Sequence, residues 1–512
     1  MELNDVKEPV EVLIVGAGPT GLTLAVELAR RGVPALLVEQ GTELFPGSRG
    51  KGLQPRTQEV FEDLGVLDAV RAAGGPYPPM MGWQDDRRLG AFQMIERAEP
   101  TPGAPYGEVW MLPQWRTARI LHERLLELGG EVAFGTALTG LTQDPDGVDA
   151  QLSYPDGSTG TVRARYLAAC DGGRSRVRAA VGIGMTGETV DPHPMLVADA
   201  RIAGLDADHW HIWQQAKGGA LALCPLAGTD HFQALAQYAD ADAVPDTSPE
   251  AVRQLIAERT PLAAADVQEV LWVSTFRARA AMADRFQEGR VFLLGDAAHV
   301  HSPAGGQGLN TSVQDAYNLG WKLGQVLRHG ADPALLDSYQ AERLPIAAGV
   351  LGISSRIHRA SVSGDADGRQ RTAEVGQLGL TYRAGRLAVD AREDVPDGAP
   401  RAGDRAPDAP CARPDGTPYR LFDAFRGPHF TLLAFGGIPV PDLPAPDTGL
   451  DTELVRVFRV GGPDPDLVDA HGHIHDGYRT ERGLLLIRPD GHLGFAAHDA
   501  HGLTDYLAAF TG

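Results

Sequence analysis

The sequence of 512 residues is poor in cysteine and has no long hydrophobic run. Its three cysteines, Cys170, Cys224 and Cys411, are far apart and form no C-x-x-C pair, which argues against a disulfide framework and a zinc site. This cysteine usage is typical of a reducing compartment, and we expect a cytoplasmic protein. No apolar stretch has the length of a membrane span, and the acidic N-terminal segment lacks the basic start of a secretory leader.

Positively charged residues are also few, since the sequence has 46 Lys and Arg against 67 Asp and Glu, which gives a formal net charge of -21. Only four of the 46 are lysines. This acidic excess argues against nucleic acid and anionic membranes as partners. The remaining composition, 43% hydrophobic and 22% charged, is that of an ordinary globular protein. The length predicts about two to four domains, enough to enclose a large ligand.

The first forty residues predict a strand, a glycine turn, a helix and a second strand. Residues 12–15 and 35–38 are short apolar runs, and residues 22–31 carry apolar side chains at helical spacing. The turn between them fits G-x-G-x-x-G, a weak motif alone but a specific one in this βαβ context. Its glycines let a pyrophosphate approach the helix N-terminus, and an acidic residue after the second strand can bind ribose hydroxyls. The expected dinucleotide contacts are Gly16, Gly18, Pro19, Thr20, Gly21, Glu39 and Gln40.

A second match to this pattern, at residues 182–187, is rejected as a nucleotide site. It follows residues 174–181, which predict a short helix instead of a strand, and Pro192 and Pro194 come soon after it. A separate NADPH-binding Rossmann domain would need such a motif, so we expect the chain to lack one.

Further along the chain, residues 132–162 alternate apolar and polar side chains around a Pro-Asp-Gly turn and predict antiparallel strands. Residues 74–81, rich in Gly, Pro and Met, predict a loop. Residues 202–273 mix short strands with a helix at 249–259 and lack glycine-rich phosphate loops, which favours a substrate-facing domain. A linker rich in Pro, Asp and Arg, at 394–414, precedes the last part of the chain.

Two more motifs complete a family fingerprint. Gly295-Asp296-Ala297-Ala298-His299 follows an apolar strand and is itself followed by Pro303 and by Gly305-Gly306-Gln307-Gly308-Leu309-Asn310. Asp171-Gly172 opens a middle motif at 171–178. Together with the opening glycine turn, these motifs make roughly residues 10–350 resemble the FAD-dependent aromatic hydroxylases related to p-hydroxybenzoate hydroxylase, and within them the bacterial hydroxylases of aromatic polyketides.

The resemblance implies FAD as cofactor, NADPH or NADH as transient reductant and O2 as co-substrate, with oxygen transferred through a C4a-hydroperoxyflavin. Asp296, at a strand end, can bind a ribityl hydroxyl, and the glycines that follow bring N–H groups and a helix N-terminus to the flavin ring. The family pattern marks Pro303 and Gly306, nearest the reacting oxygen, as the catalytic positions. It also marks these further cofactor contacts: Arg49, Gln114, Asp171, Pro303, Gly306, Gln307, Gly308, Leu309 and Asn310.

The implied fold is α/β. It has a Rossmann-like FAD-binding domain that is discontinuous in sequence (1–180 and 274–393), an α+β substrate-binding domain (181–273) and a C-terminal thioredoxin-like domain (394–512). The likeness of this last domain lies in residues 401–407 and 486–491. Because Cys411 is its only cysteine, dithiol redox chemistry is excluded there.

A phenolate substrate would react faster than a phenol, but the sequence does not identify the base that would form it. Apolar and aromatic walls would suit a flat polycyclic aromatic molecule, and the middle domain offers Trp213, Gln215, Cys224, Pro225, Phe232, Phe276 and Arg277. No metal is expected, because His299 and His301 have no third ligand at suitable spacing. We expect a monomer or homodimer that works in antibiotic or secondary-metabolite biosynthesis.

Several alternatives stay open. Baeyer–Villiger oxygenation of a ketone uses the same fold, and the motifs do not separate it from hydroxylation. Hydroxylation of a simple phenol, or hydroxylation that inactivates an antibiotic, is also compatible with them. A flavin halogenase would carry a W-x-W-x-I-P element, which is absent. A non-catalytic FAD-binding module belongs to a different class, and the segment from Pro303 to Asn310 argues against it.

Overall fold

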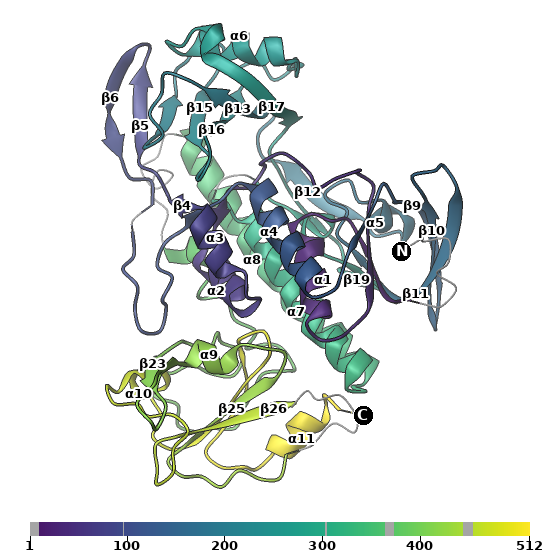
Figure 1. The fold of residues 1–512 in the computed structure, drawn as a ribbon, viewed down its shortest axis with the longest axis vertical. Coiled ribbons are helices and arrows are strands. Elements are labelled where there is room, and N and C mark those ends of the chain that lie inside the picture. The colour runs from purple at the N-terminus through teal and green to yellow at the C-terminus, as the bar shows by residue number, and fades with distance from the viewer. Residues whose placement is uncertain (1–9, 96, 303–304, 364–372, 444–453, 512) are drawn as a thin grey trace.

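The computed structural model describes residues 10–95, 97–302, 305–363, 373–443 and 454–511. Figure 1 shows three tiers, with a lobe built around α6 at the top, a central body of long helices and a sheet, and the C-terminal part at the bottom. Within the described residues, no helix combines the length and apolar character required to cross a bilayer.

The central body contains an eight-stranded sheet whose core strands are parallel. Their order is β20-β11-β1-β2-β8, with β19 at one end and the hairpin β9-β10 attached to β11. The bounds are β1 (Val10–Val15), β2 (Ala35–Glu39), β8 (Val132–Phe134), β9 (Ala137–Asp144), β10 (Gly147–Ser153), β11 (Thr159–Ala169), β19 (Gln287–Glu288) and β20 (Val291–Leu293). The antiparallel strands expected within 132–162 are β9, β10 and the start of β11.

The helices of the central body pack on this sheet and on one another. They are α1 (Pro19–Ala29), α2 (Pro55–Asp63), α3 (Leu67–Ala73), α4 (Gln114–Glu127), α5 (Arg176–Ala180), α7 (Gly308–Arg328) and α8 (Asp337–Ser363). In β1 the side chains of residues 12–14 are fully buried, as expected for a parallel strand covered on both faces. Helices α1 and α7 approach so closely that a Cβ at Gly320 would lie 2.4 Å from Cγ of Glu27.

The top lobe is a seven-stranded sheet covered on one face by α6 (Pro249–Arg259). Its order is β17 (Val267–Phe276), β13 (Met195–Ile202), β16 (His231–Gln237), β15 (Leu221–Pro225), β14 (Trp210–Trp213), β5 (Met80–Gln84) and β6 (Arg87–Phe92). The loop expected at 74–81 is wrong near both ends, because residues 75–76 form a short strand paired with Trp110–Met111 and β5 begins at Met80 and pairs with β14. This pairing joins segments far apart in the chain, which a local sequence pattern cannot reveal.

Shorter strands connect these parts. They are β3 (Gly52–Leu53), β4 (Gly75–Pro76), β7 (Trp110–Met111), β12 (Met185–Thr189), β18 (Arg279–Ala283) and β21 (His299–Val300). The rejected second glycine pattern runs into β12, which pairs with β18, so a strand follows it where a phosphate site would need a helix.

The C-terminal part forms a sheet of order β22-β28-β27-β25-β26. Strands β25 and β26 are parallel, whereas β27 is antiparallel to both β25 and β28. The bounds are β22 (Val389–Asp390), β23 (Pro410–Ala412), β24 (Pro418–Arg420), α9 (Leu421–Phe425), β25 (Phe430–Phe435), β26 (Val455–Val460), α10 (His473–Tyr478), β27 (Gly483–Ile487), β28 (Leu493–Ala497) and α11 (Leu503–Ala508).

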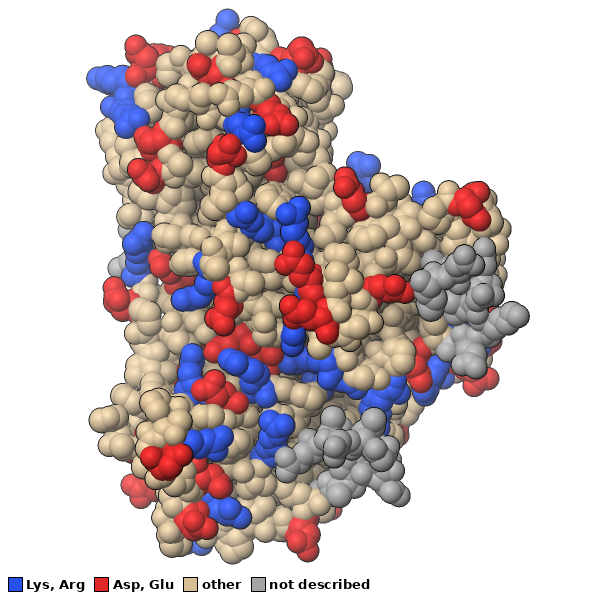
Figure 2. All heavy atoms as spheres, viewed as in Figure 1, with Lys and Arg blue, Asp and Glu red and all other residues tan. Residues whose placement is uncertain are grey.

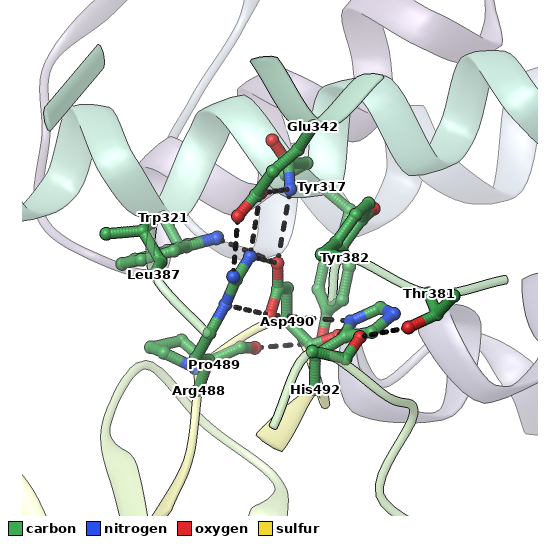
Figure 3. A network of polar contacts seen from close by, with 12 residues as sticks. Tyr317, Trp321, Glu342, Thr381, Tyr382, Leu387, Arg488, Pro489, Asp490 and His492 are labelled. Carbon is green, nitrogen blue, oxygen red and sulfur yellow. Dashed lines mark hydrogen bonds and ion pairs between the residues drawn. The ribbon is translucent and has the colours of Figure 1, made fainter. Parts of the chain in front are cut away.

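A buried cluster of charges joins the C-terminal part to α7 and α8. Arg488 pairs with Glu342 at 2.7 Å and with Asp490 at 2.6 Å (Figure 3). Lys322 also pairs with Glu342, at 2.7 Å. Trp321 of α7 donates its indole N–H to Asp490 at 3.1 Å. Burial lowers the pKa of the Lys322 ammonium to about 8. Burial alone would raise the pKa of the Glu342 carboxyl, but the positive charges of Arg488 and Lys322 lower that pKa.

Outside this cluster, acidic and basic side chains are interspersed over the seam between the central body and the C-terminal part (Figure 2). Glu62 of α2, for example, contacts Arg420 at 3.3 Å and Arg426 at 3.2 Å. Exposed pairs of this kind contribute little each, whereas a buried pair becomes very costly once one partner is removed.

We therefore expect Arg488→Met to lower the free energy of unfolding by about 3–5 kcal/mol, because Glu342 and Asp490 would remain buried without their cation. Arg383, which is 54% exposed and pairs with Asp404, provides the matched control. Arg383→Met should cost less than about 1 kcal/mol. Denaturant unfolding of the two variants measures the difference, and equal losses would contradict the importance of the buried cluster.

Candidate functional site

The three sequence motifs meet at one edge of the parallel sheet. Val15 of β1 lies beside Ala169 of β11, and Ala169 lies beside Leu293 of β20. The glycine turn, the Asp171 motif and the Gly295 motif therefore leave the sheet side by side, at the carboxyl ends of three adjacent strands. This is the edge at which open α/β sheets bind ligands.

The first glycine turn is shaped for a close approach by an anion. Gly16 has φ +104°, and a Cβ there would lie 2.5 Å from the carbonyl oxygen of Cys170. A Cβ at Gly21 would lie 1.9 Å from the carbonyl oxygen of Gly16, whereas the space beside Gly18 is open. Helix α1 begins at Pro19, and no side chain caps its N-terminus. Its first N–H groups are thus available to a phosphate.

The neighbouring acidic residue is held in place by the same turn. The Glu39 carboxylate accepts hydrogen bonds from Ala17 N–H and Gly41 N–H, both at 2.8 Å, and is partly exposed. Thr20 lies against the third motif, since a Cβ at Gly295 would be 2.8 Å from its Oγ1. Gln40 is exposed next to Glu39. This arrangement can bind an adenosine ribose beside the pyrophosphate position.

Asp171 and Asp296 have different surroundings. One oxygen of Asp171 accepts the N–H groups of Arg176 at 2.8 Å and Val177 at 3.2 Å, so this carboxylate orders the start of α5. The Asp296 side chain is exposed, yet desolvation by the surrounding protein raises the pKa of its carboxyl. The Asp296 carboxyl can therefore be reached from outside although protein surrounds it, and such a position suits a hydrogen bond to a cofactor hydroxyl.

The glycines before α7 present a second helix N-terminus. Gly305 and Gly306 have φ of +88° and +61°, and α7 begins at Gly308 without a side-chain cap. The Asn310 side chain donates to the carbonyl oxygens of Gly306 at 2.8 Å and Gly52 at 2.9 Å. The Gln307 side chain donates to the carbonyl oxygen of Gly305 at 2.8 Å. These amides fix the turn, and the N–H groups of the helix remain to meet a flavin ring.

Pro303 lies outside the described residues, so the structure does not place this expected catalytic position. Gly306, the other one, is exposed at the turn, and Leu309 is half-buried behind it.

Residues 45–54, here called the bridging segment, connect this turn to the top lobe. Gln54 N–H donates to Asn310 Oδ1 at 2.8 Å, and Gly50 N–H donates to Gln114 Oε1 at 2.9 Å. Toward the lobe, Arg49 donates to Ser274 of β17 at 3.4 Å. The expected contacts Arg49 and Gln114 therefore both lie along the junction between the two bodies.

The face of the lobe sheet that meets the bridging segment carries a polar row. Cross-strand pairing places Cys224, Gln233, Asp199 and Trp272 next to one another on four adjacent strands. Lys51 donates to Gln233 Oε1, and its ammonium lies 4.4 Å from the ring centroid of Trp210. At the other end, Trp272 packs against Phe45 with ring centroids 5.2 Å apart.

Asp199 is the most unusual member of this row. It is 2% exposed, and the hydroxyl and N–H of Ser48 lie beside its carboxyl. Burial raises the pKa of this carboxyl to about 6, and hydrogen bonding from Ser48 and the charge of Lys51 limit the rise. A buried carboxyl with few hydrogen-bond donors costs stability when it ionises, and such groups gather at functional sites.

The substrate residues expected from the sequence are not gathered at this face. Trp213 and Phe232 belong to the core beneath α6, on the opposite face of the sheet, and Pro225 is the cross-strand partner of Phe232. Cys224 does lie in the polar row and is buried. Phe276 ends β17 on the same face as Trp272, whereas Gln215 is exposed after β14 and Arg277 donates to the carbonyl oxygens of Pro192 and Ala241.

Lys51, Asp199 and Gln233 were not predicted from the sequence. A signal existed for two of them, because Asp199 is a lone acid inside the apolar run 195–200 and Lys51, two residues after Arg49, is one of only four lysines. Their proximity could not be inferred, since it depends on pairing between distant strands.

His299 and His301, for which the sequence predicts no metal, form a hydrogen-bonded chain with Asp315. His301 contacts His299 at 2.9 Å, and His299 contacts the buried Asp315 at 2.6 Å. Over the described ranges, no group of three His, Cys, Asp or Glu is arranged to hold a metal ion.

We expect Gly21→Ala to abolish flavin retention, because the new methyl group would collide with the Gly16 carbonyl and displace the turn. Gly349→Ala in α8 is the matched control, since nothing lies within 4 Å of that Cβ. The flavin absorbance of the purified variants, per mole of protein, measures the effect. Normal flavin content in Gly21→Ala would refute this role of the turn.

Asp199→Asn should stabilise the protein at alkaline pH. The pKa of Asp199 is raised in the fold, so its carboxyl favours folding only while protonated, and that contribution is lost as pH rises through about 6. At about pH 8 the variant should gain up to about 3 kcal/mol in the free energy of unfolding, and at about pH 4 nearly nothing. The exposed Asp208→Asn, as control, should show no such pH dependence.

Comparisons with known proteins agree with this geometry. Residues 9–354 match the family model described as FAD binding domain, and residues 399–512 match the model of the aromatic-ring hydroxylase C-terminal domain. A flavin-dependent monooxygenase of Mycobacteroides abscessus is 42% identical over 503 residues, which cover 97% of this chain and 99% of the relative.

Two further relatives carry more specific names. The 12-dehydrotetracycline 5-monooxygenase/anhydrotetracycline 6-monooxygenase of Streptomyces rimosus is 34% identical, covering 98% of this chain and 99% of its own length. A solved ternary complex of aklavinone-11 hydroxylase with FAD and aklavinone superimposes with a TM-score of 0.81 at 29% identity, covering 99% of both chains. With both family models and near-complete coverage by such relatives, the chain belongs to the FAD-dependent aromatic-ring hydroxylases, a family of flavoprotein monooxygenases.

Proposed function

We propose that this monooxygenase consumes NAD(P)H and O2 to hydroxylate a bulky polycyclic phenol of the aromatic-polyketide type. The observation that carries the proposal is the bridging segment, which ties the N-terminus of α7 to the lobe sheet and brings its own Lys51 to Gln233 and Asp199 on that sheet. Through it, a cofactor position and a set of substrate-binding groups lie at one junction. A reaction between a bound flavin and an aromatic ring needs this proximity.

The cofactor fits the described residues. The turn from Gly16 to Gly21, with Pro19 and Thr20, would hold the pyrophosphate, Glu39 and Gln40 the adenosine ribose, and Asp296 a ribityl hydroxyl. The N–H groups at Gly308, Leu309 and Asn310 would face the flavin ring, beside Gly306 and Pro303. Arg49, Gln114, Asp171 and Gln307 would support these loops. When bound, FAD supplies the reducing equivalents and the activated oxygen.

The substrate class rests on the names of the relatives and on the shape of the lobe. Relatives are named for tetracycline intermediates and for aklavinone, all polycyclic and phenolic. In this chain Trp210 and Trp272, large aromatic side chains of the kind that line sites for flat molecules, border the polar row at its two ends. A role in secondary-metabolite biosynthesis follows from the same resemblance.

The division into domains is also a proposal. We assign the FAD-binding domain to the central body and the substrate domain to the seven-stranded sheet, which takes β5 and β6 in addition to residues within 181–276. For the C-terminal part we propose a thioredoxin-like fold. Its strand order β28-β27-β25-β26, with β25 parallel to β26 and β27 antiparallel, supports this assignment. Its place against α7 favours a packing role.

The test is NADPH and NADH oxidation by the FAD-loaded protein with a panel of simple and polycyclic phenols, followed by mass spectrometry of the products. We expect a polycyclic phenol to stimulate oxidation and to gain one oxygen atom. A gain accompanied by expansion or opening of a ketone ring would replace hydroxylation by Baeyer–Villiger chemistry. If FAD binds but no phenol stimulates oxidation, the proposed substrate class is wrong.

A further inference from the structure

We propose that Asp199 accepts the proton of a substrate hydroxyl and that Lys51 holds the oxyanion so formed, in the polar row between Trp210 and Trp272. This proposal deepens the proposed function and rests on it. It names the base and the class of group that the site recognises, which is a phenolic hydroxyl at the edge of a flat ring system.

The first argument is the position of Asp199 in the lobe sheet. Successive side chains of a strand point to opposite faces. Leu196, Ala198 and Ala200 of β13 belong to the core beneath α6, so Asp199 faces the other way, toward the bridging segment. Its cross-strand neighbours are Gln233 on β16 and Trp272 on β17. The carboxylate thus lies at the junction where the N-terminus of α7 is tied to the lobe.

The second argument is that the acceptor capacity of Asp199 is only partly used. A carboxylate has two oxygens, and a buried one ordinarily accepts several hydrogen bonds, whose loss costs free energy. Within the described residues, Ser48 is the hydrogen-bonding neighbour that lowers the pKa of Asp199, whose side chain is 2% exposed. The fold therefore retains an acceptor that an incoming hydroxyl could satisfy.

The third argument is the cation beside it. Lys51 comes from the bridging segment, lies over the ring of Trp210 and donates to Gln233, which is the direct neighbour of Asp199 in the row. An ammonium has three donor hydrogens, so it can bind Gln233 and a substrate oxygen together. Its charge also lowers the pKa of Asp199 from the value that burial alone would set, which keeps the carboxylate available near neutral pH.

The proposed step is a simple proton transfer. The O–H bond of the substrate breaks, the proton moves to an oxygen of Asp199, and the electron pair stays on the substrate oxygen facing Lys51. The resulting phenolate directs electron density to the ring carbons ortho and para to it, which makes them better acceptors of electrophilic oxygen. After the new hydroxyl forms and the ring regains aromaticity, the proton leaves Asp199 for solvent.

Few other groups act on Asp199. The bridging segment presents Ser48 and Lys51 to it, β16 presents Gln233, and β17 presents Trp272. Lys51 is the charged group that shifts its ionisation. A pH dependence near 6 in ligand binding can therefore be assigned to Asp199 by a single substitution.

The first experiment measures binding without turnover. The FAD-loaded, oxidised protein is titrated with 2-hydroxyanthracene between about pH 5 and pH 7.5, and anthracene serves as the probe without a hydroxyl. The affinity for 2-hydroxyanthracene should rise about tenfold as Asp199 ionises, because the carboxylate then accepts the hydroxyl hydrogen. Asp199→Asn should remove this rise, and anthracene should show none. A pH-independent affinity in the wild type, or a rise that persists in Asp199→Asn, overturns the proposal.

The second experiment measures turnover of a phenol accepted in the oxidation assay. Asp199→Asn should lower kcat about 100-fold at neutral pH, in the range lost with a general base, and should lose the acid limb of the kcat/KM profile. The loss should shrink for a more acidic phenol of the same shape, which ionises unaided. A loss that is equal for both phenols would indicate a structural role and overturn the proposal.

Two further variants complete the test. Lys51→Met should weaken binding of the ionised probe at alkaline pH by tenfold or more while leaving anthracene unaffected. Asp208→Asn, an exposed carboxylate of the same lobe, should behave as the wild type. Flavin content and thermal unfolding establish that each variant is folded. If the wild type shows the binding pattern but hydroxylates no phenol, the proposed function is wrong and the role of Asp199 in binding stands. If Asp199→Asn still hydroxylates the phenol at the wild-type rate, the proposed function stands and the assignment of Asp199 as the base is wrong.

Discussion

Parallel pairing of β1 with its neighbours is the constraint on which the rest of the structure depends. Because β2, β11 and β20 run in the same direction as β1, their carboxyl ends share one edge, and every segment that leaves this edge reaches the same small region. The glycine turn with Glu39 is more than a hundred residues from Asp171, and Asp171 is more than a hundred residues from Asp296, yet all of them meet at this edge. Two uncapped helix N-termini, those of α1 and α7, then give this region its affinity for negative charge.

Much of the cofactor half of the site could be predicted from the sequence, and the substrate half could not. The glycine turn and Asp296 are local signals, since strand, turn and helix follow one another directly in the chain. The substrate face depends instead on which way each strand of the lobe sheet points. Trp213 attracted attention as a large aromatic residue, but it stacks on Trp83 beneath α6, 5.2 Å between ring centroids. Asp199, three strands away on β13, faces the bridging segment, and only the register of β13 reveals it.

Helix α7 connects the candidate cofactor position to the C-terminal part. Helix α7 begins at Gly308 beside the candidate cofactor position, and thirteen residues later Trp321 and Lys322 enter the buried charge cluster under the C-terminal part. The C-terminal part thus stabilises the helix whose first turn lies at the candidate cofactor position. Glu342 of α8 pairs with Lys322, and Asp490 accepts the indole N–H of Trp321, so the cluster holds α7 from two sides.

Asn310 has a consequence for motion in the site. Its single side chain bonds the carbonyl oxygens of Gly306 and Gly52 and the N–H of Gln54, so it fastens the turn before α7 to the segment that carries Lys51. A shift of the turn that admits or releases a cofactor ring must therefore pull Lys51 across the lobe, or break these three bonds first. While these bonds hold, the Asn310 amide couples movement of the turn before α7 to movement of the bridging segment.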